Sequence, residues 1–385
     1  MKAANKFPKR LVFIITDLLT GGAEMMLYKL LSSLNRERFD PIVISLMDRG
    51  RLGDLIEALS IPVYTVGMKP GIPTPKAAYC LLQTVRQLQP DLIQGWMYHG
   101  NVAAQLSSIL SLQKTPVFWD IQNSIYSLDY EKKMTVAVIN LSAYISKLAR
   151  KIIFVSKVSQ LQHEALGFYV QEACVIPNGI DTGMFITSVE SRLSVRAELG
   201  LPEETILIGL IARFHPQKDH KNFLQAAALL SKNYSNVHFL LAGQGVERNN
   251  LGLHQLIQEL GLINQISLLG ERTDIPRLNS ALDITSLSSA YGEGFPLAVG
   301  EAMSCGVPCV VTDVGDSAWL VGNTGRVVPP RDPEGLCTAW LELIEMGTLA
   351  RRELGARARQ RIKDNFSLES VVQKYQQIYE EVISG

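Results

Sequence analysis

Two carboxylates flank a short apolar run in the stretch YGEGFPLAVGEAMSCG, residues 291–306. Glu293 stands just before Gly-Phe-Pro, and Glu301 lies further along the run. Pro296 suits the first position of a helix, because its missing N–H has no partner there and its φ is already helical. Gly306 suits the position just beyond the end of that helix. The stretch therefore predicts a strand-to-helix loop that carries Glu293 and a helix that carries Glu301.

The start of this helix is suited to bind an anion, because its first N–H groups are unpaired and the helix dipole is positive there. Carboxylates, in contrast, accept hydrogen bonds from hydroxyls. A nucleotide sugar presents hydroxyls, phosphates and hydroxyls again in that order. We predict that Glu293 binds the sugar and that Glu301 binds the ribose. The residues predicted to bind the diphosphate at the helix start are Gly294, Phe295, Leu297 and Ala298.

Two cations accompany another predicted strand, TILIGLIARF at residues 205–214. Arg213 and Lys218 are placed on the loop after this strand. Two positive charges at this position could hold a diphosphate and stabilise it as a leaving group. A solvated basic loop is the alternative. His215 and His220 lie on the same loop, but their spacing does not suit a metal pair on a helix.

Other candidate residues follow other predicted strands. Gly21 and Gly22 let a backbone approach a phosphate or sugar closely, although a tight turn alone would also use them. His99 follows the strand DLIQGW, at the end where parallel sheets bind ligands. Gly243 opens a GQG stretch that imitates a dinucleotide fingerprint without its third glycine, so a nicotinamide cofactor is disfavoured and a nucleotide contact is kept. Arg272 follows the next strand and is a candidate neighbour of the base or phosphate.

The elements that must position these residues are apolar strands alternating with amphipathic helices, which is typical of parallel sheets covered on both faces. Each half of the chain contains such a series, which predicts two doubly wound, Rossmann-like α/β domains facing across a cleft. We place an acceptor-binding domain at 1–190 and a donor-binding domain at 191–366. A C-terminal helix, 367–385, is expected to pack back toward the N-terminal domain. The predicted strands are 11–16, 41–46, 62–66, 91–96, 116–121 and 151–156, then 205–214, 236–243, 265–270, 283–289, 307–313 and 325–330.

The composition excludes several classes of protein. The chain has 385 residues, 47% hydrophobic and 19% charged, and its 37 basic and 37 acidic side chains cancel. A dedicated nucleic-acid binder would be basic, so no nucleic-acid partner is expected. Residues 1–190 carry 19 basic and 15 acidic side chains, which could favour a phosphate-bearing or membrane-surface partner. The five scattered cysteines contain no CxxC pair, which favours a reducing, cytoplasmic location and disfavours structural zinc.

The glutamate–seven residues–glutamate stretch resembles the motif of the retaining family 4 glycosyltransferases, which have the GT-B fold. Segments similar to other family motifs occur in the same order, among them GGAEMML, QGWMYHGNVAA and IGLIARFHPQKDHKNFLQA. The resemblance implies a nucleoside-diphosphate sugar donor, a saccharide or lipid-linked acceptor, and a front-face mechanism in which the departing phosphate assists. It implies that His99 contacts the donor sugar. The catalytic set is then His99, Glu293, Arg213 and Lys218.

Alternatives remain open at this stage. A nucleotide-sugar epimerase, or an inactive nucleotide-sugar binding protein of the same fold, would share most of these residues. A glycoside hydrolase is disfavoured, because both glutamates lie along one corner rather than on opposite sides of a bond. No Asp-x-Asp motif occurs, and the nearest string is Asp129-Tyr130-Glu131, before a predicted helix, so neither a metal nor another cofactor is expected.

The segment EKKMTVAVINLSAYISKLARKII, residues 131–153, combines an apolar stripe with basic ends. It could be a packed helix, which the pattern favours. It could also be a helix of the N-terminal domain that contacts the inner face of a membrane peripherally.

Overall fold

The protein folds as two compact units, and the computed structural model describes residues 8–19, 21–69, 74–125, 128 and 133–384. Unit 1 comprises Met1–Gly179 and Leu368–Gly385, and unit 2 comprises Ile180–Ser367. The division therefore falls earlier than the expected residue 190. The C-terminal segment from Leu368 is part of unit 1, although the whole of unit 2 separates it from that unit in sequence.

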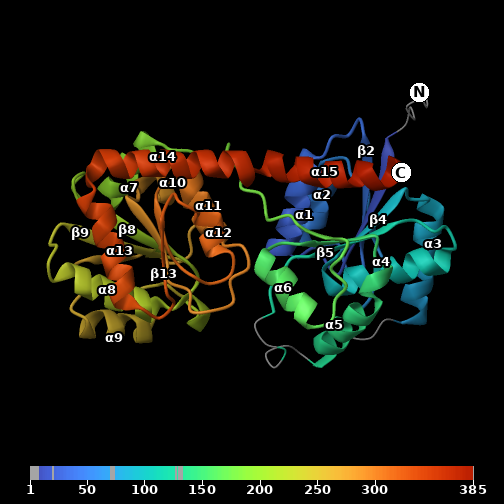
Figure 1. Ribbon diagram of the computed structural model, residues 1–385, viewed down its shortest axis with the longest axis horizontal. Helices are drawn as coiled ribbons and strands as arrows, with labels where there is room; N and C mark the ends of the chain where they lie inside the picture. The colour runs from blue at the N-terminus through green and yellow to red at the C-terminus, as the bar shows by residue number, and fades with distance from the viewer. Residues whose placement is uncertain (1–7, 20, 70–73, 126–127, 129–132, 385) are drawn as a thin grey trace. The chain divides into compact units, whose positions relative to one another are not determined.

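Unit 1 contains a seven-stranded parallel sheet in the order β3-β2-β1-β4-β5-β6-β7. Figure 1 labels β2, β4 and β5 of this sheet together with several of the surrounding helices. The strands are β1 (Lys9–Ile15), β2 (Phe39–Ser45), β3 (Val63–Thr65), β4 (Leu92–Trp96), β5 (Val117–Ile121), β6 (Lys151–Phe154) and β7 (Ala173–Val175). The helices are α1 (Gly22–Ser33), α2 (Gly50–Ala58), α3 (Pro75–Leu88), α4 (Met97–Ser111), α5 (Lys133–Ile145), the 3₁₀ turn η2 (Ser146–Leu148), α6 (Lys157–Ala165) and α15 (Leu368–Ser384).

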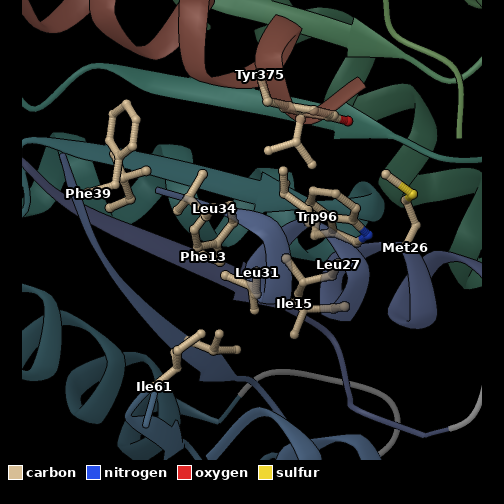
Figure 2. Packing of buried hydrophobic residues seen from close by; sticks show 14 of the residues in the cluster. Phe13, Ile15, Met26, Leu27, Leu31, Leu34, Phe39, Ile61, Trp96 and Tyr375 are labelled. Carbon is tan, nitrogen blue, oxygen red and sulfur yellow. The ribbon is translucent and has the colours of Figure 1, made fainter. Parts of the chain in front are cut away.

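Successive side chains of each strand point to opposite faces of this sheet, and both faces are buried. Phe13 and Ile15 of β1 pack with α1, α2 and α15, whereas Val12 and Ile14 pack with α3, α4 and α5. Figure 2 shows part of the first cluster, with Trp96 lying near Tyr375 from α15. The strand is apolar along its whole length because helices cover both faces of the sheet.

Helix α15 is joined to the sheet of unit 1 by buried polar groups as well as by packing. Tyr375 donates a hydrogen bond of 2.7 Å from its hydroxyl to the Asp120 carboxylate on β5. Tyr379 donates one of 2.5 Å to Gln94 Oε1 on β4, and Gln94 Nε2 donates to Asp120 at 3.0 Å. Burial raises the pKa of Asp120 to about 7, although hydrogen bonds from Tyr375, Gln122 and Gln94 oppose the shift. This network fixes where α15 lies on the sheet.

Unit 2 contains a six-stranded parallel sheet in the order β10-β9-β8-β11-β12-β13. The strands are β8 (Ile206–Ile211), β9 (Val237–Ala242), β10 (Ile266–Leu268), β11 (Ile284–Leu287), β12 (Cys309–Thr312) and β13 (Arg326–Val328). The helices are α7 (Val189–Leu199), the 3₁₀ turn η3 (Pro216–Lys218), α8 (His220–Ser231), α9 (Leu251–Glu259), α10 (Ile275–Ala281), α11 (Leu297–Ser304), α12 (Ser317–Val321), α13 (Pro333–Glu345) and α14 (Gly347–Asn365). Helices α8, α9 and α13 cover one face of the sheet.

The expected fold class, two doubly wound parallel sheets, is confirmed. The structure adds β7 to the strands predicted for unit 1, and β7 pairs with β6. The polar stretch at 188–204, interpreted as the region of the domain boundary, instead forms α7 within unit 2. Arg196 on this helix is buried and hydrogen-bonds Asp283 and the backbone carbonyls of Pro202 and Thr205. A buried arginine whose two terminal nitrogens both donate hydrogen bonds explains why so polar a segment is part of the folded unit.

Candidate active site

The candidate site of unit 2 lies at the carboxyl edge of its sheet, where three loops follow neighbouring strands. Strand β8 lies between β9 and β11, so the loops at 212–219, 243–250 and 288–296 are adjacent. Ala290 N donates to Gln217 O at 2.8 Å, and Gln217 Nε2 donates to Gly292 O at 2.7 Å. These bonds fasten the loop after β8 to the loop after β11. The segments that carry Lys218 and Glu293 are thus held together before any ligand binds.

The Glu293 carboxylate is the centre of this loop cluster. The residue is 6% exposed, and its Oε1 atom accepts hydrogen bonds from Lys218 Nζ and Ser289 Oγ, both at 2.5 Å. Ser288 Oγ adds a bond of 2.8 Å to the carbonyl of Lys218. The cation and the carboxylate that the sequence assigned to diphosphate and sugar therefore form an ion pair with each other. An ammonium has three donors, so Lys218 can keep Glu293 and still bind a phosphate oxygen.

The loop after β12 supports Glu293 from another side. Gly315 has φ +61, and a Cβ built on it would lie 2.1 Å from the Glu293 carbonyl oxygen. Asp316 N donates to Gly294 O at 3.0 Å, and Thr312 Oγ1 donates to Ser289 O at 2.7 Å. Sequence reasoning missed Gln217, Ser289 and Gly315. Gly315 could have been identified in the sequence as a glycine in the loop that directly follows a strongly apolar strand.

The N-terminus of α11 is open, as an anion site requires. Pro296 is the N-cap residue, with φ −77 and ψ 93, and Leu297 is the first helical residue. The sequence predicted Pro296 as the first residue of the helix. In the structure Pro296 lies just before the helix, because its ψ is extended rather than helical. Among the described residues, the N–H groups of Leu297 and Ala298 donate to no protein acceptor. Gly306 ends the helix with φ +77, as expected.

The other residues of unit 2 that were predicted to bind the nucleotide sugar lie either at the loop cluster around Glu293 or away from it. Arg213 is exposed and reaches Gln217 Oε1 at 3.5 Å, so its charge is available beside Lys218. Gly243 has φ +145, and a Cβ there would lie 2.3 Å from Ala212 O, so glycine lets the loop after β9 approach the end of β8. Phe295 is buried against Trp319 and Phe366, which indicates a packing role.

Arg272 and Glu301 are not among the residues that surround Glu293. Arg272 forms ion pairs with Asp274 at 2.7 Å and with Glu198 of α7 at 2.9 Å. The hydrogen bonds that Arg272 donates to Asp274 and Glu198 raise the pKa of its guanidinium, so its charge is already compensated by protein carboxylates. Glu301 lies half-buried on α11, one turn beyond Leu297, as the sequence predicts.

In unit 1, His99 lies in the first turn of α4, directly after β4. The turn is tight: a Cβ on Gly95 would lie 2.4 Å from Asn101 Cα, and one on Gly100 would lie 2.3 Å from Ile14 O. Asn101 is buried within α4, where its side-chain amide forms hydrogen bonds with the backbone of Asp120 on β5. Burial lowers the pKa of His99, which favours a neutral imidazole.

Gly21 and Gly22 begin α1, after β1. Gly21 is the N-cap with φ −142, and a Cβ on it would lie 2.2 Å from the Glu24 carboxylate. Gly22 is exposed and has open space around the position of a Cβ. Desolvation raises the pKa of Glu24, which faces the helix N-terminus. Neither glycine has a backbone conformation that excludes other residues.

No group of three or more His, Cys, Asp or Glu side chains among the described residues is arranged to hold a metal ion. No helix in the same part of the chain is both long and apolar enough to cross a membrane.

Comparison with known proteins was made against families, curated sequences and solved structures. The family model described as Glycosyltransferase Family 4 matches residues 20–183, and that described as Glycosyl transferases group 1 matches residues 191–361. The structure is similar to that of HepE from Anabaena in complex with UDP, with a TM-score of 0.83 and 25% identity over 97% of this chain and 100% of that one.

Two curated relatives share part of the sequence. The UDP-Gal:alpha-D-GlcNAc-diphosphoundecaprenol alpha-1,3-galactosyltransferase of Escherichia coli is 28% identical over 213 residues, 54% of each chain. The N-acetyl-alpha-D-glucosaminyl L-malate synthase of Bacillus anthracis is 29% identical over 191 residues, 49% of each chain. The matches thus span about half the length of these relatives.

Two doubly wound parallel-sheet units, with a C-terminal helix that packs on the first, define the GT-B class of fold. The two family models together match most of the chain, one in each unit. The chain belongs to the family 4 glycosyltransferases.

Proposed function

We propose that the protein is a retaining hexosyltransferase that moves a sugar from a nucleoside-diphosphate sugar to a saccharide or lipid-linked acceptor. The observation that carries the proposal is the loop cluster of unit 2. There a buried carboxylate, two cations and an open helix N-terminus gather at the carboxyl edge of one sheet. The crystal structure of HepE, the similar protein described above, contains UDP.

The diphosphate is assigned to Lys218, Arg213 and the N–H groups at the start of α11. Charge builds on the phosphate oxygen as its bond to the sugar breaks, and these donors are in place before that happens. Each charge-assisted hydrogen bond contributes about 1.5–3 kcal/mol. Glu293 is assigned to the sugar hydroxyls, because one of its oxygens is fixed by Lys218 and Ser289 while the carboxylate retains further acceptor capacity.

His99 is assigned to orienting the donor sugar. Its neutral imidazole can donate or accept a hydrogen bond to a hydroxyl without adding charge. Four further residues are proposed to contact the nucleotide-sugar donor: Gly21, Gly22, Gly243 and Glu301. Arg272 is the weakest member of the proposed set, because Asp274 and Glu198 already occupy its guanidinium.

We propose that transfer needs no divalent ion, because the two cations and the helix start supply the positive charge that the leaving diphosphate requires. Excess chelator should then leave turnover unchanged, and complete loss would contradict the assignment. Retention is tested separately by recording the anomeric configuration of the first product by NMR. An inverted product would exclude the front-face mechanism.

The acceptor is proposed to be a saccharide or a lipid-linked saccharide, as the name of the Escherichia coli relative states for that protein. We place the reaction in the cytoplasm with peripheral membrane contact through unit 1. All five cysteines are free, which suits a reducing compartment.

A screen of nucleoside-diphosphate sugars tests the function as a whole. We expect one donor to yield free nucleoside diphosphate, detected by mass spectrometry, and to yield more of it when saccharide acceptors are added. Conversion of the donor to an isomer, with no nucleoside diphosphate released, would favour an epimerase. Binding of a donor without any product would favour an inactive binding protein.

A further inference from the structure

Unit 1 exposes large apolar side chains on the face covered by α3, α4 and α5, where a monomeric protein would be expected to present polar residues. Large contiguous patches of this kind mark binding surfaces. Leu112 at the C-terminus of α4 is 83% exposed, and Tyr144 on α5 is 76% exposed. The other exposed members are Tyr79 on α3, Leu106, Ile109 and Leu110 on α4, Met134 and Leu141 on α5, and Leu148 on η2.

A groove of about 810 Å³ lies between these three helices and is almost entirely apolar. Its walls include Leu82 of α3, Leu106 and Leu110 of α4, and Val138 and Leu141 of α5. His99 also lines it, so the groove reaches the residue assigned to the donor sugar. Met134 and Leu141 belong to the stripe for which the sequence favoured internal packing. The structure leaves both exposed instead, because Ile139 and Ser142 form the buried face of α5.

Within the described helices of this face, the charged side chains are all basic. Helices α3, α4 and α5 and the turn η2 contain no aspartate or glutamate. Lys76, Arg86, Lys133 and Lys147 lie on these elements, and Lys114 follows α4. Lys147 lies 5.4 Å from the ring centre of the exposed Tyr144. Apolar side chains bordered by cations, with aromatic residues among them, complement an anionic lipid surface.

We propose that the α3–α4–α5 face of unit 1 docks on an anionic lipid bilayer, with one lipid chain lying in the groove. The exposed leucines enter the acyl region, and the lysines contact the headgroup phosphates. This inference deepens the proposed function, on which it rests for its purpose: docking would bring the head of a lipid-linked acceptor toward His99. A second copy of the chain is the competing occupant, but two copies would bring the same lysines together.

Co-sedimentation with vesicles, without donor or acceptor, tests the proposal separately from transfer activity. We expect the full chain to bind vesicles of phosphatidylcholine mixed with phosphatidylglycerol, and to bind pure phosphatidylcholine vesicles far more weakly. The double variant Ile109→Gln/Leu110→Gln should weaken binding about tenfold or more, because two side chains no longer enter the apolar layer. The matched control is Leu251→Gln/Leu349→Gln, which changes two exposed leucines of unit 2 and should bind like the wild type.

Two further variants address folding and charge. Leu112→Asn should fold normally, because Leu112 has φ +61 and asparagine tolerates that conformation well, and it should still weaken binding. Lys133→Gln/Lys147→Gln should weaken binding to the anionic vesicles by about tenfold or more and leave binding to neutral vesicles unchanged. Lys232→Gln, on an exposed lysine at the end of α8, is the control.

Wild-type binding by all folded variants, or no binding of the wild type to anionic vesicles, would overturn the proposal. Self-association in solution that the Ile109→Gln/Leu110→Gln variant abolishes, without vesicle binding, would assign the face to a second copy. If transfer to a water-soluble acceptor persists while vesicle binding fails, only the docking surface is wrong. If vesicles bind but no donor is turned over, only the proposed function is wrong.

Discussion

At the scale of single residues, the ion pair between Lys218 and Glu293 links the stability of the site to its proposed chemistry. Replacing Glu293 by glutamine keeps the shape and the contact with Ser289, but leaves Lys218 without its carboxylate. We expect Glu293→Gln to lose nearly all transfer and to lose about 1–3 kcal/mol of unfolding free energy. Turnover and thermal melting measure the two effects. Glu342→Gln, at the exposed pair with Arg326, should change neither, and near-normal turnover by Glu293→Gln would exclude its assignment.

Lys218 is expected to contribute twice, once to folding and once to binding. Lys218→Gln leaves the buried Glu293 charge uncompensated, which is more costly than removing both charges. The double variant Lys218→Gln/Glu293→Gln should therefore melt at a higher temperature than Lys218→Gln alone. Both variants should bind nucleoside diphosphate about tenfold to a hundredfold more weakly by calorimetry. Lys221→Gln, on an exposed lysine of the following helix, is the control, and unchanged affinity in Lys218→Gln would contradict the diphosphate assignment.

Gly315 is a residue whose role depends on space rather than on chemistry. Alanine there would meet the Glu293 carbonyl at 2.1 Å and would have to adopt φ +61. We expect Gly315→Ala to lower the unfolding free energy by about 1–3 kcal/mol and to reduce turnover, because the loop that holds Glu293 must move. Gly252→Ala, at an unobstructed position in α9, should melt at or above the wild-type temperature. Full activity in Gly315→Ala would show that the loop tolerates displacement.

At the scale of elements, α15 shows how a distant segment completes a unit. Tyr375→Phe removes the hydroxyl that donates a hydrogen bond to the Asp120 carboxylate. The buried carboxylate then keeps only its hydrogen bonds from Gln94 and Gln122. We expect unit 1 to lose about 1–3 kcal/mol, the cost of unpairing a buried polar group. Hydrogen exchange of α15 and β5 should accelerate while peptides of unit 2 stay unchanged. Gln377→Ala, on the exposed face of α15, is the control, and unaltered exchange in Tyr375→Phe would mean that packing alone holds the helix.

The strands could be predicted from the sequence because each is a short apolar run between turn residues, and parallel sheets buried on both faces require such runs. The prediction missed β7, a half-buried strand of three residues. The ends of α7 and α11 depended on contacts that no local pattern reveals. Arg196 of α7 donates a hydrogen bond to Asp283, which is distant in sequence. Pro296 is the N-cap residue of α11 because its ψ is extended. Glu293, Lys218 and Arg213 could be proposed as site residues from the sequence because charges after apolar strands are conspicuous. Ser289 and Gln217 were not, because common polar loop residues carry no such signal.

At the scale of the whole molecule, buried histidines should make the two units respond differently to acid. Burial lowers the pKa of His163 in unit 1, and of His220 and His238 in unit 2, from 6.5 to about 4. The unfolded chain therefore binds protons that the folded one does not as pH falls from 6.5 to 4, and stability is lost over that window. Asp120 acts in the opposite sense, because its folded pKa of about 7 lies above the unfolded value of 3.8. Its protonation in the folded state restores stability to unit 1 as pH falls through the same window.

We therefore expect unit 2 to open first on acidification from pH 7 to 4.5, as hydrogen exchange measured peptide by peptide would show. His220→Phe should reduce this sensitivity. The His220 ring is buried and packs on Phe214, so an apolar ring of similar size can take its place. His254→Gln, on an exposed histidine of the same unit, should leave the pH profile as it is. If unit 1 instead loses protection first, the Asp120 carboxylate must be ionised throughout this range, and its hydrogen bonds rather than its burial would then determine its charge.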